Sequence, residues 1–195
     1  NNAYPLIKGA AKGLQRAGKL PSAAINVMNA DAHSGYRIAE GRHSGNSFRY
    51  AMEEGFLKKY AVIGLQENYN SQRVMDDLYS NINIQYSTFE DISLREKLNF
   101  RQAIVQAISF TEESFTGIEL DMDCIEQMLS SSSNPSGFTA LQARQYINFT
   151  AYYPHIAYLH ICEGAAQLVN GQSNAFAAKL VSELVSDFIK VNRKQ

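Results

Sequence analysis

The sequence predicts an α/β protein: a three-layer α/β/α sandwich in which helices cover both faces of a parallel sheet. Short apolar runs of strand length alternate with amphipathic helical patterns along all 195 residues. The apolar runs are nearly continuous rather than alternating, which is typical of strands that are buried on both faces. Neither an internal repeat nor a linker divides the chain, so we expect one domain over residues 1–195.

Five strands are expected, each from a short run of apolar and β-branched residues between polar or glycine-containing segments. They lie at residues 23–29, 60–65, 82–88, 116–122 and 155–162. The polar, glycine-rich segment 30–46 follows the first strand and is expected to be a loop, as is the run SSSSNPSG at 130–137.

Six helices are expected between and around these strands. They lie at residues 4–18, 48–59, 70–81, 94–110, 138–153 and 174–191. Pro5 suits the first turn of the first helix and Gly18 suits its end. In the fourth helix, apolar residues at 94, 98, 104, 105 and 108 form a stripe with helical spacing.

Composition excludes several classes of partner. The net charge is −1 and no long run of one sign occurs, so neither nucleic acid nor an anionic membrane is expected as a partner. No apolar run approaches the ~20 residues of a membrane span. Cys124 and Cys162 lack CxxC spacing, which favours a reduced, cytoplasmic setting. The chain starts without Met and enters a helical pattern at once, so we expect a fragment whose N-terminal part is missing.

Ionisable residues follow three of the expected strands directly. Asp31 and His33 follow the first, Asp121 and Asp123 end the fourth, and Glu163 follows the fifth. Ligands of parallel sheets bind at the carboxyl ends of the strands, and a period of two turns both members of each pair to one side. Carboxylates with an imidazole suit Mn²⁺, Zn²⁺ or Fe²⁺, with a harder ion favoured. Each pair alone is a weak signal, because most such pairs are strand-end caps or solvated loop acids.

The motifs in their order resemble the arginase (ureohydrolase) superfamily, and most of all its formimidoylglutamase-like branch. They are DAH at 31–33, HSGN at 43–46, LDMD at 120–123 and CEG at 162–164, together with NNAYPLIKG at the start, EGRHSGNSFRYA at 40–51 and GLQENYN at 64–70. The resemblance covers essentially the whole chain. It implies the same three-layer fold, with this chain as a C-terminal two-thirds fragment.

The resemblance also implies a metal site. Members of the superfamily hydrolyse a C–N bond of a guanidino or formimidoyl group with two Mn²⁺ ions bridged by hydroxide. Asp31, His33, Asp121 and Asp123 match the ligands of one ion. The other ion keeps only two of them, because Gly35 stands in place of the second Asp of D-x-H-x-D and the family's first His would precede residue 1. The number of bound ions, whether two, one or none, is therefore left open. If the site is a decayed two-metal centre, Gly35→Asp is expected to raise Mn²⁺ binding.

Further roles follow from the same resemblance. Glu163 matches the acid that pairs with the cationic nitrogen group of the substrate. Arg37 would bind a substrate carboxylate, or is a solvated loop residue. His43 would be a catalytic proton shuttle, or a hydrogen-bonded loop histidine. Ser44 and Asn46 would bind the amino-acid end of the substrate, or hold the loop.

The expected function is a Mn²⁺-dependent hydrolase that converts N-formimidoyl-glutamate and water to glutamate and formamide, a reaction of histidine catabolism. A related hydrolase of another small guanidino or amidino substrate is a variant of this hypothesis. The alternative is a non-catalytic arginase-fold protein with a degraded metal site, which acts as a binding module; Gly35 favours it. A homo-oligomer is left open.

Overall fold

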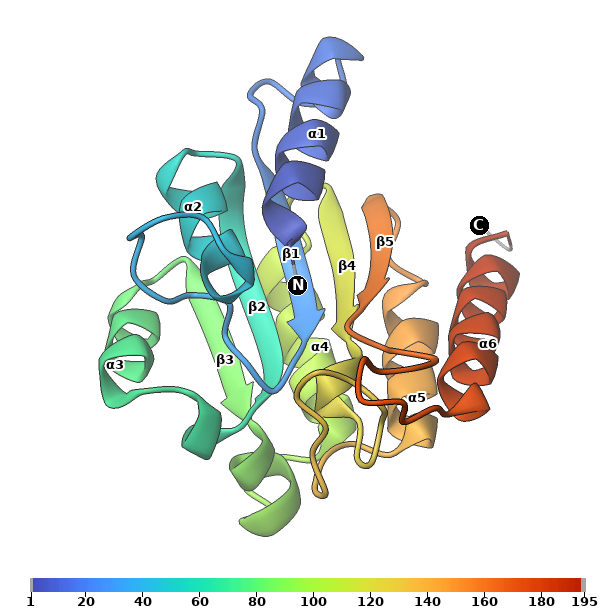
Figure 1. Cartoon of the computed structure of the whole chain (residues 1–195). Coiled ribbons are helices and arrows are strands. Elements are labelled where there is room, and N and C mark those ends of the chain that lie inside the picture. The colour runs from blue at the N-terminus through green and yellow to red at the C-terminus, as the bar shows by residue number, and fades with distance from the viewer. Residues whose placement is uncertain (1, 194–195) are drawn as a thin grey trace.

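The computed structural model describes residues 2–193 and contains a parallel five-stranded sheet between two layers of helices (Figure 1). The strand order is β3-β2-β1-β4-β5, so the first strand of the chain lies at the centre of the sheet. The strands are β1 (Ile25–Ala30), β2 (Leu57–Leu65), β3 (Ile84–Thr88), β4 (Thr116–Asp121) and β5 (Ile156–Cys162). The expected three-layer α/β/α fold is confirmed.

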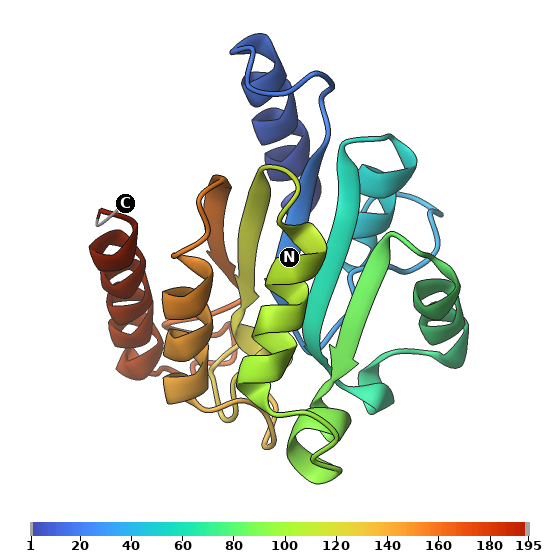
Figure 2. The same ribbon diagram turned by 180° about the vertical axis from the view of Figure 1, so that it is seen from behind.

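Three helices cover each face of the sheet. On the face turned to the viewer in Figure 1 lie α1 (Ala3–Arg16), α2 (Ser47–Glu53) and α3 (Gln72–Ser80). On the other face, seen in Figure 2, lie α4 (Phe100–Thr111), α5 (Ala140–Thr150) and α6 (Ala175–Asn192). Three short 3₁₀ turns, at Ser44–Asn46, Glu67–Tyr69 and Met122–Cys124, and a π-helical turn at Glu90–Leu94 complete the described elements.

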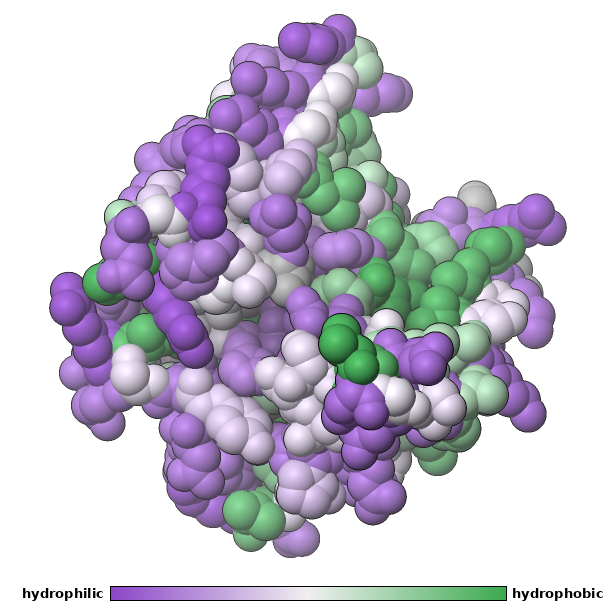
Figure 3. Space-filling view, in the orientation of Figure 1, coloured by the Kyte–Doolittle hydropathy of each residue, from purple (hydrophilic) through white to green (hydrophobic). Residues whose placement is uncertain are grey.

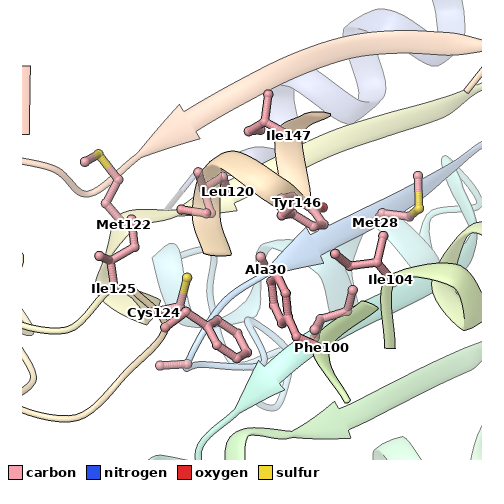
Figure 4. Close-up of a cluster of buried hydrophobic side chains, with 14 of the residues drawn as sticks. Met28, Ala30, Phe100, Ile104, Leu120, Met122, Cys124, Ile125, Tyr146 and Ile147 are labelled. Atoms are coloured by element: carbon pink, nitrogen blue, oxygen red, sulfur yellow. The ribbon is translucent and has the colours of Figure 1, made fainter. Parts of the chain in front are cut away.

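Two apolar clusters hold these layers together. Under α4, α5 and α6, Met28 and Leu120 of the sheet pack with Ile104, Tyr146 and Ile147 of the helices (Figure 4). Alternate residues of the same strands point the other way and form a second cluster with α1, α2 and α3. The strands are buried on both sides near the middle of the sheet, which explains their continuous hydrophobicity.

The expected helix at 48–59 is wrong in its second half. Helix α2 ends at Glu53, and residues from Leu57 onward belong to β2. Gly55 has φ +77°, its N–H donates to Met52 O at 3.0 Å, and the N–H of Phe56 donates to Ala51 O at 2.8 Å. This pair of bonds is a Schellman motif, which ends helices at a left-handed residue, most often glycine.

The expected helix at 94–110 also begins later than its apolar stripe suggests. Asn99 caps α4: its Oδ1 accepts from Gln102 N at 2.9 Å, and its own N–H donates to Gln102 Oε1 at 2.7 Å. This capping box sets the first turn. Leu94, the first residue of the stripe, lies in the preceding π-helical turn with its side chain exposed.

The sheet is unevenly covered on the side of β5. Every residue of β5 is half-buried, whereas all residues of β1 and β4 are buried. On the viewer's side of Figure 1 no described helix lies in front of β5, and in Figure 3 apolar residues gather where β5 and α6 lie. Within residues 2–193 no helix is long and apolar enough to cross a membrane.

Candidate functional site

A cavity of about 190 Å³ opens at the carboxyl ends of the central strands. Its walls come from the ends of β1 and β4, the segment after β5 and three loops. Its lining includes most of the residues expected at the site: Asp31, His33, Arg37, His43, Ser44, Asp121, Asp123 and Glu163. Residues as far apart in the chain as Asp31 and Glu163 thus meet at one edge of the sheet, as the carboxyl-end rule predicts.

Three of these carboxylates are nearly inaccessible to solvent. Asp31 is 2% exposed, Asp121 3% and Asp123 5%. His33 lies between two of them, with Nδ1 3.7 Å from Asp31 Oδ1 and 3.8 Å from Asp123 Oδ2. Asp123 Oδ1 is buried and has no hydrogen-bond partner among the described residues.

Crowding changes the proton affinity of this group. Burial, followed by the charges of Asp31 and Asp123, raises the pKa of Asp121 to about 9. Burial also raises the pKa of Asp123, and the carboxylate of Asp31 adds to that effect. The pKa of His33 is raised chiefly by the neighbouring Asp31 carboxylate. Without a bound cation, Asp121 therefore holds its proton more tightly than a solvated aspartate does.

The spacing of the two pairs has a local structural cause. Asp31 Oδ1 accepts from the backbone N–H of His33 at 2.7 Å, and Asp121 Oδ1 accepts from the backbone N–H of Asp123 at 3.0 Å. A carboxylate that bonds the N–H two residues ahead bends the chain in an Asx turn. β1 thus ends directly before Asp31 and β4 ends at Asp121, and the residue two places after each aspartate turns back toward the same cavity.

Two buried polar side chains beside Asp31 hold its carboxylate in place through hydrogen bonds. Asn29 is fully buried on β1, and its Nδ2 donates to Asp31 Oδ2 and to Tyr60 Oη, each at 3.1 Å. Tyr60 Oη in turn donates to the carbonyl of Ser34 at 2.9 Å. Such bonds fix the orientation of a ligating carboxylate. Sequence reasoning missed Asn29, although its place two residues before Asp31 in a buried strand puts it on the same face.

Gly35 lies in the same loop in a left-handed conformation. Its φ is +56°, and a Cβ there would lie 2.5 Å from Cδ2 and 2.9 Å from Cε2 of Phe48. The Phe48 ring is buried and stacks on Tyr60 with ring centroids 4.4 Å apart. An aspartate at 35 would therefore need both a strained backbone and a displaced core ring, so a simple restoration of the missing ligand is not expected to work.

The loop residues expected to bind substrate fall into two groups. Arg37, His43 and Ser44 line the cavity, and within residues 2–193 no hydrogen bond or ion pair engages the Arg37 guanidinium. Asn46 is fully buried: its Nδ2 donates to the carbonyls of Ile38 at 3.0 Å and Gly41 at 2.8 Å, and its Oδ1 accepts from His43 N at 3.0 Å. This geometry favours the loop-holding alternative for Asn46.

Glu163 reaches the cavity from the segment after β5, with an unusual φ of +63°. Its Oε2 accepts from Ser131 Oγ at 3.2 Å. Ser131 and Ser132 also line the cavity, as do Tyr69, whose ring stacks on His33 with centroids 5.3 Å apart, and Asn70. Sequence reasoning treated the serine run as a flexible loop; its place between β4 and α5, at the carboxyl edge of the sheet, was the available signal.

The donor set fits Mn²⁺. It offers three buried carboxylates and one imidazole, and it includes Asp123 Oδ1, a buried carboxylate oxygen without a hydrogen-bond partner among the described residues. Carboxylate and imidazole ligands without thiolate suit a hard divalent ion. Asp31, Asp121, Asp123 and His33 are thus the residues that could hold it.

Comparisons with known proteins show the family of the chain. The Arginase family model matches residues 1–186. A formimidoylglutamase of Macrococcus caseolyticus is 28% identical over 178 residues, which is 89% of this chain and 53% of that protein, so the chain spans about half of that relative's length.

Solved structures show the same fold. Formimidoylglutamase from Bacillus subtilis superposes with a TM-score of 0.77 at 18% identity, covering 98% of this chain and 59% of that one. Trypanosoma cruzi formiminoglutamase with Mn²⁺ superposes with a TM-score of 0.75 at 20% identity, covering 95% of this chain and 61% of that one. The family model matches nearly all of the chain, and the chain has the family's fold around a carboxylate-rich cavity. The chain therefore belongs to the arginase family.

Proposed function

We propose that the protein containing this chain is a Mn²⁺-dependent hydrolase that converts N-formimidoyl-glutamate and water to glutamate and formamide. The observation that carries the proposal is the meeting of three buried carboxylates and His33 with Glu163 and Arg37 around one cavity. Relatives named formimidoylglutamase support this substrate class. The same site chemistry extends to other small guanidino or amidino compounds.

The roles of the residues follow from their positions. Asp31, His33, Asp121 and Asp123 would hold Mn²⁺, which when bound lowers the pKa of a water molecule so that it is a nucleophile near neutral pH. Glu163, held by Ser131, would pair with the planar cationic formimidoyl group, which suits a bidentate carboxylate. Arg37 would bind a carboxylate of the glutamate moiety. Its guanidinium lines the cavity and forms no hydrogen bond or ion pair with the described residues.

His43 would move a proton to the leaving amine. It lines the cavity, and its Nδ1 accepts from the N–H of Gly45 at 3.1 Å. In the neutral ring this bond leaves the proton on Nε2, from which it can be donated. The same bond anchors the loop, so His43 would combine the two roles considered for it.

The number of ions is a separate part of the proposal. Gly35 offers no side chain, and Phe48 closes the space that one would need. We therefore expect one tightly bound Mn²⁺ in the set Asp31, His33, Asp121 and Asp123. The alternative of a non-catalytic binding module rests on this same departure at Gly35, and the comparisons do not favour it.

The direct test is an assay of the whole protein, loaded with Mn²⁺ and desalted, with release of glutamate and formamide as the readout. N-formimidoyl-glutamate is expected to be hydrolysed in preference to arginine and agmatine. Glu163→Gln should lower kcat/KM by about a hundredfold or more, on the scale of losing one charge that stabilises a transition state. Glu126→Gln, a change at an exposed residue outside the cavity lining, is the matched control. Bound Mn²⁺ without hydrolysis of any of the three compounds would favour the binding module.

A further inference from the structure

A second group of metal-ligating side chains lies on the sheet, apart from the carboxylate cavity. Glu119 of β4 is the register partner of His160 of β5, and Asp121 of β4 is the register partner of Cys162. The neighbours Leu120 and Ile161 pack on the side of α4, α5 and α6, so Glu119, His160 and Cys162 point to the opposite face. That is the face of β5 over which no described helix lies (Figure 1).

The three side chains are close enough to share one ion. Each side chain offers one ligand atom, and the three atoms lie within 4.8 Å of one another. They are a carboxylate oxygen, an imidazole nitrogen and the thiol sulfur. Glu119 is fully buried, and its Oε1 accepts from Tyr158 Oη at 2.8 Å, which leaves Oε2 facing His160 Nδ1 at 2.5 Å. The His160 side chain is 27% exposed and Cys162 is half-buried, so a cation can enter from solvent.

We propose that Glu119, His160 and Cys162 form a site for a thiophilic divalent cation such as Zn²⁺ or Cd²⁺. One sulfur, one nitrogen and one oxygen ligand, with a fourth position open to water, is a donor set typical of zinc. It contrasts with the three carboxylates and one imidazole of the Asp31 cavity, which suit a harder ion. The two sites therefore select different metals by ligand softness.

Binding displaces protons from two ligands. The cation binds the thiolate of Cys162, whose thiol proton leaves to solvent. It also binds His160 Nδ1, whose proton, now held against Glu119, leaves to solvent or moves to Nε2 of the ring. At metal–ligand distances near 2.0–2.1 Å, tetrahedral geometry places nitrogen and oxygen about 3.3 Å apart, so His160 has to move less than about 1 Å away from Glu119. Tyr158 keeps its hydrogen bond to the other carboxylate oxygen and fixes Glu119 in place.

The site adjoins the Asp31 cavity without being part of it. Cys162 Sγ lies 3.6 Å from Asp121 Oδ2, which is the nearest group from the carboxylate set. The cavity lining does not include Glu119, His160 or Cys162. This cation site requires no hydrolytic activity, so a metal titration tests it separately from the proposed enzyme function.

The experiment is a Cd²⁺ titration of the whole, reduced protein preloaded with Mn²⁺, followed by the ultraviolet charge-transfer band of thiolate bound to Cd²⁺. We expect the band to saturate at one Cd²⁺ per chain. Cys162→Ser should abolish it, and Cys124→Ser should retain it, because Cys124 is the fully buried second cysteine and lies outside the group. Asp31→Asn should also retain it, which would separate this site from the carboxylate cavity.

A second variant keeps the test decisive if Cys162→Ser does not fold. His160→Gln preserves the thiol and should weaken Cd²⁺ binding by about tenfold or more, because one of three ligands is replaced by a poor one. Circular dichroism checks that each variant is folded. No band in the wild type, a band that Cys162→Ser leaves intact, or equal Cd²⁺ affinity in folded His160→Gln would overturn the proposal.

Discussion

The ring of Phe48 occupies the space beside Gly35 in which a side chain would otherwise lie. A Cβ on Gly35 would come 2.5 Å from Phe48 Cδ2, at a residue whose φ is +56°. By its resemblance to the family's D-x-H-x-D motif, the chain has Gly35 where a ligand aspartate is expected, and a core ring fills the volume of that side chain. Loss of the ligand and packing of the aromatic ring are therefore coupled.

The first prediction concerns this coupling. Gly35→Ala and Gly35→Asp should each lower the free energy of unfolding by about 1–3 kcal/mol, because both add a Cβ to a strained, occupied position. Phe48→Ala should cost about 3–5 kcal/mol by itself. Combining Gly35→Asp with Phe48→Ala should cost less than the sum of the two, since the new side chain has space. Denaturant unfolding of the four variants measures this, and strictly additive losses would contradict it.

Metal stoichiometry is the second prediction. Elemental analysis after Mn²⁺ loading and desalting should find one ion per chain in the wild type. The variant that carries both Gly35→Asp and Phe48→Ala should approach two ions, whereas Gly35→Ala with Phe48→Ala, which supplies space without a carboxylate, should stay at one. Two ions in the wild type would mean that another group compensates for Gly35.

A third prediction is that Asp121→Asn has opposite effects with and without metal. In the metal-free protein it should raise the free energy of unfolding by about 1–3 kcal/mol, because it removes a carboxylate whose burial and neighbouring charges raise its pKa to about 9. In saturating Mn²⁺ the wild type should gain about 2.7 kcal/mol at a hundredfold excess over Kd, and the variant should gain little. Thermal unfolding of both proteins, with Mn²⁺ and with chelator, is the measurement. Destabilisation of the metal-free variant would contradict the interpretation of charge crowding.

The fourth prediction is a pH dependence with a defined sign. The folded pKa of Asp121, about 9, lies above its ordinary value of 3.8, so the metal-free folded state binds the extra proton and its stability falls as pH rises between these values. Mn²⁺ binds the ionised carboxylate, so its affinity should increase with pH. Titration calorimetry from about pH 6 to about pH 8 should show that the affinity for Mn²⁺ rises by a factor approaching ten per pH unit. An affinity that is flat over this range would indicate that Asp121 is already ionised.

Arg37 gives the fifth prediction. Arg37→Ala should raise KM for N-formimidoyl-glutamate by about ten- to a hundredfold with a smaller change in kcat, because a charge-assisted pair with a substrate carboxylate is lost. Arg101→Ala is the control, since Arg101 is exposed on α4 and its guanidinium lies over the Phe149 ring, away from the cavity. Equal effects of the two changes would assign Arg37 to the solvated loop. Agmatine, which has no carboxylate, should be insensitive to Arg37→Ala.

Much of the fold could be predicted because its signals are local. Continuous apolar runs predicted the five strands, and helical spacing predicted the six helices between and around them. The errors were at helix ends, where Gly55 stops α2 and Asn99 starts α4 through hydrogen bonds that apolar periodicity does not register. The pairing of Asp31 with His33 and of Asp121 with Asp123 was also visible, since Asx turns depend on residues two apart.

The sequence by itself determined the layer architecture, the place of the acidic pairs at strand ends and the absence of a ligand side chain at Gly35. Only the tertiary structure decided that Phe48 fills that place, that Ser131 holds Glu163, and that Glu119 lies beside His160. The reason is physical: periodicity and turn chemistry act over a few residues, whereas these contacts join segments 13 to 41 positions apart. Strand order, register and the packing of side chains between layers bring those segments together, and none of these is a property of a single stretch of chain.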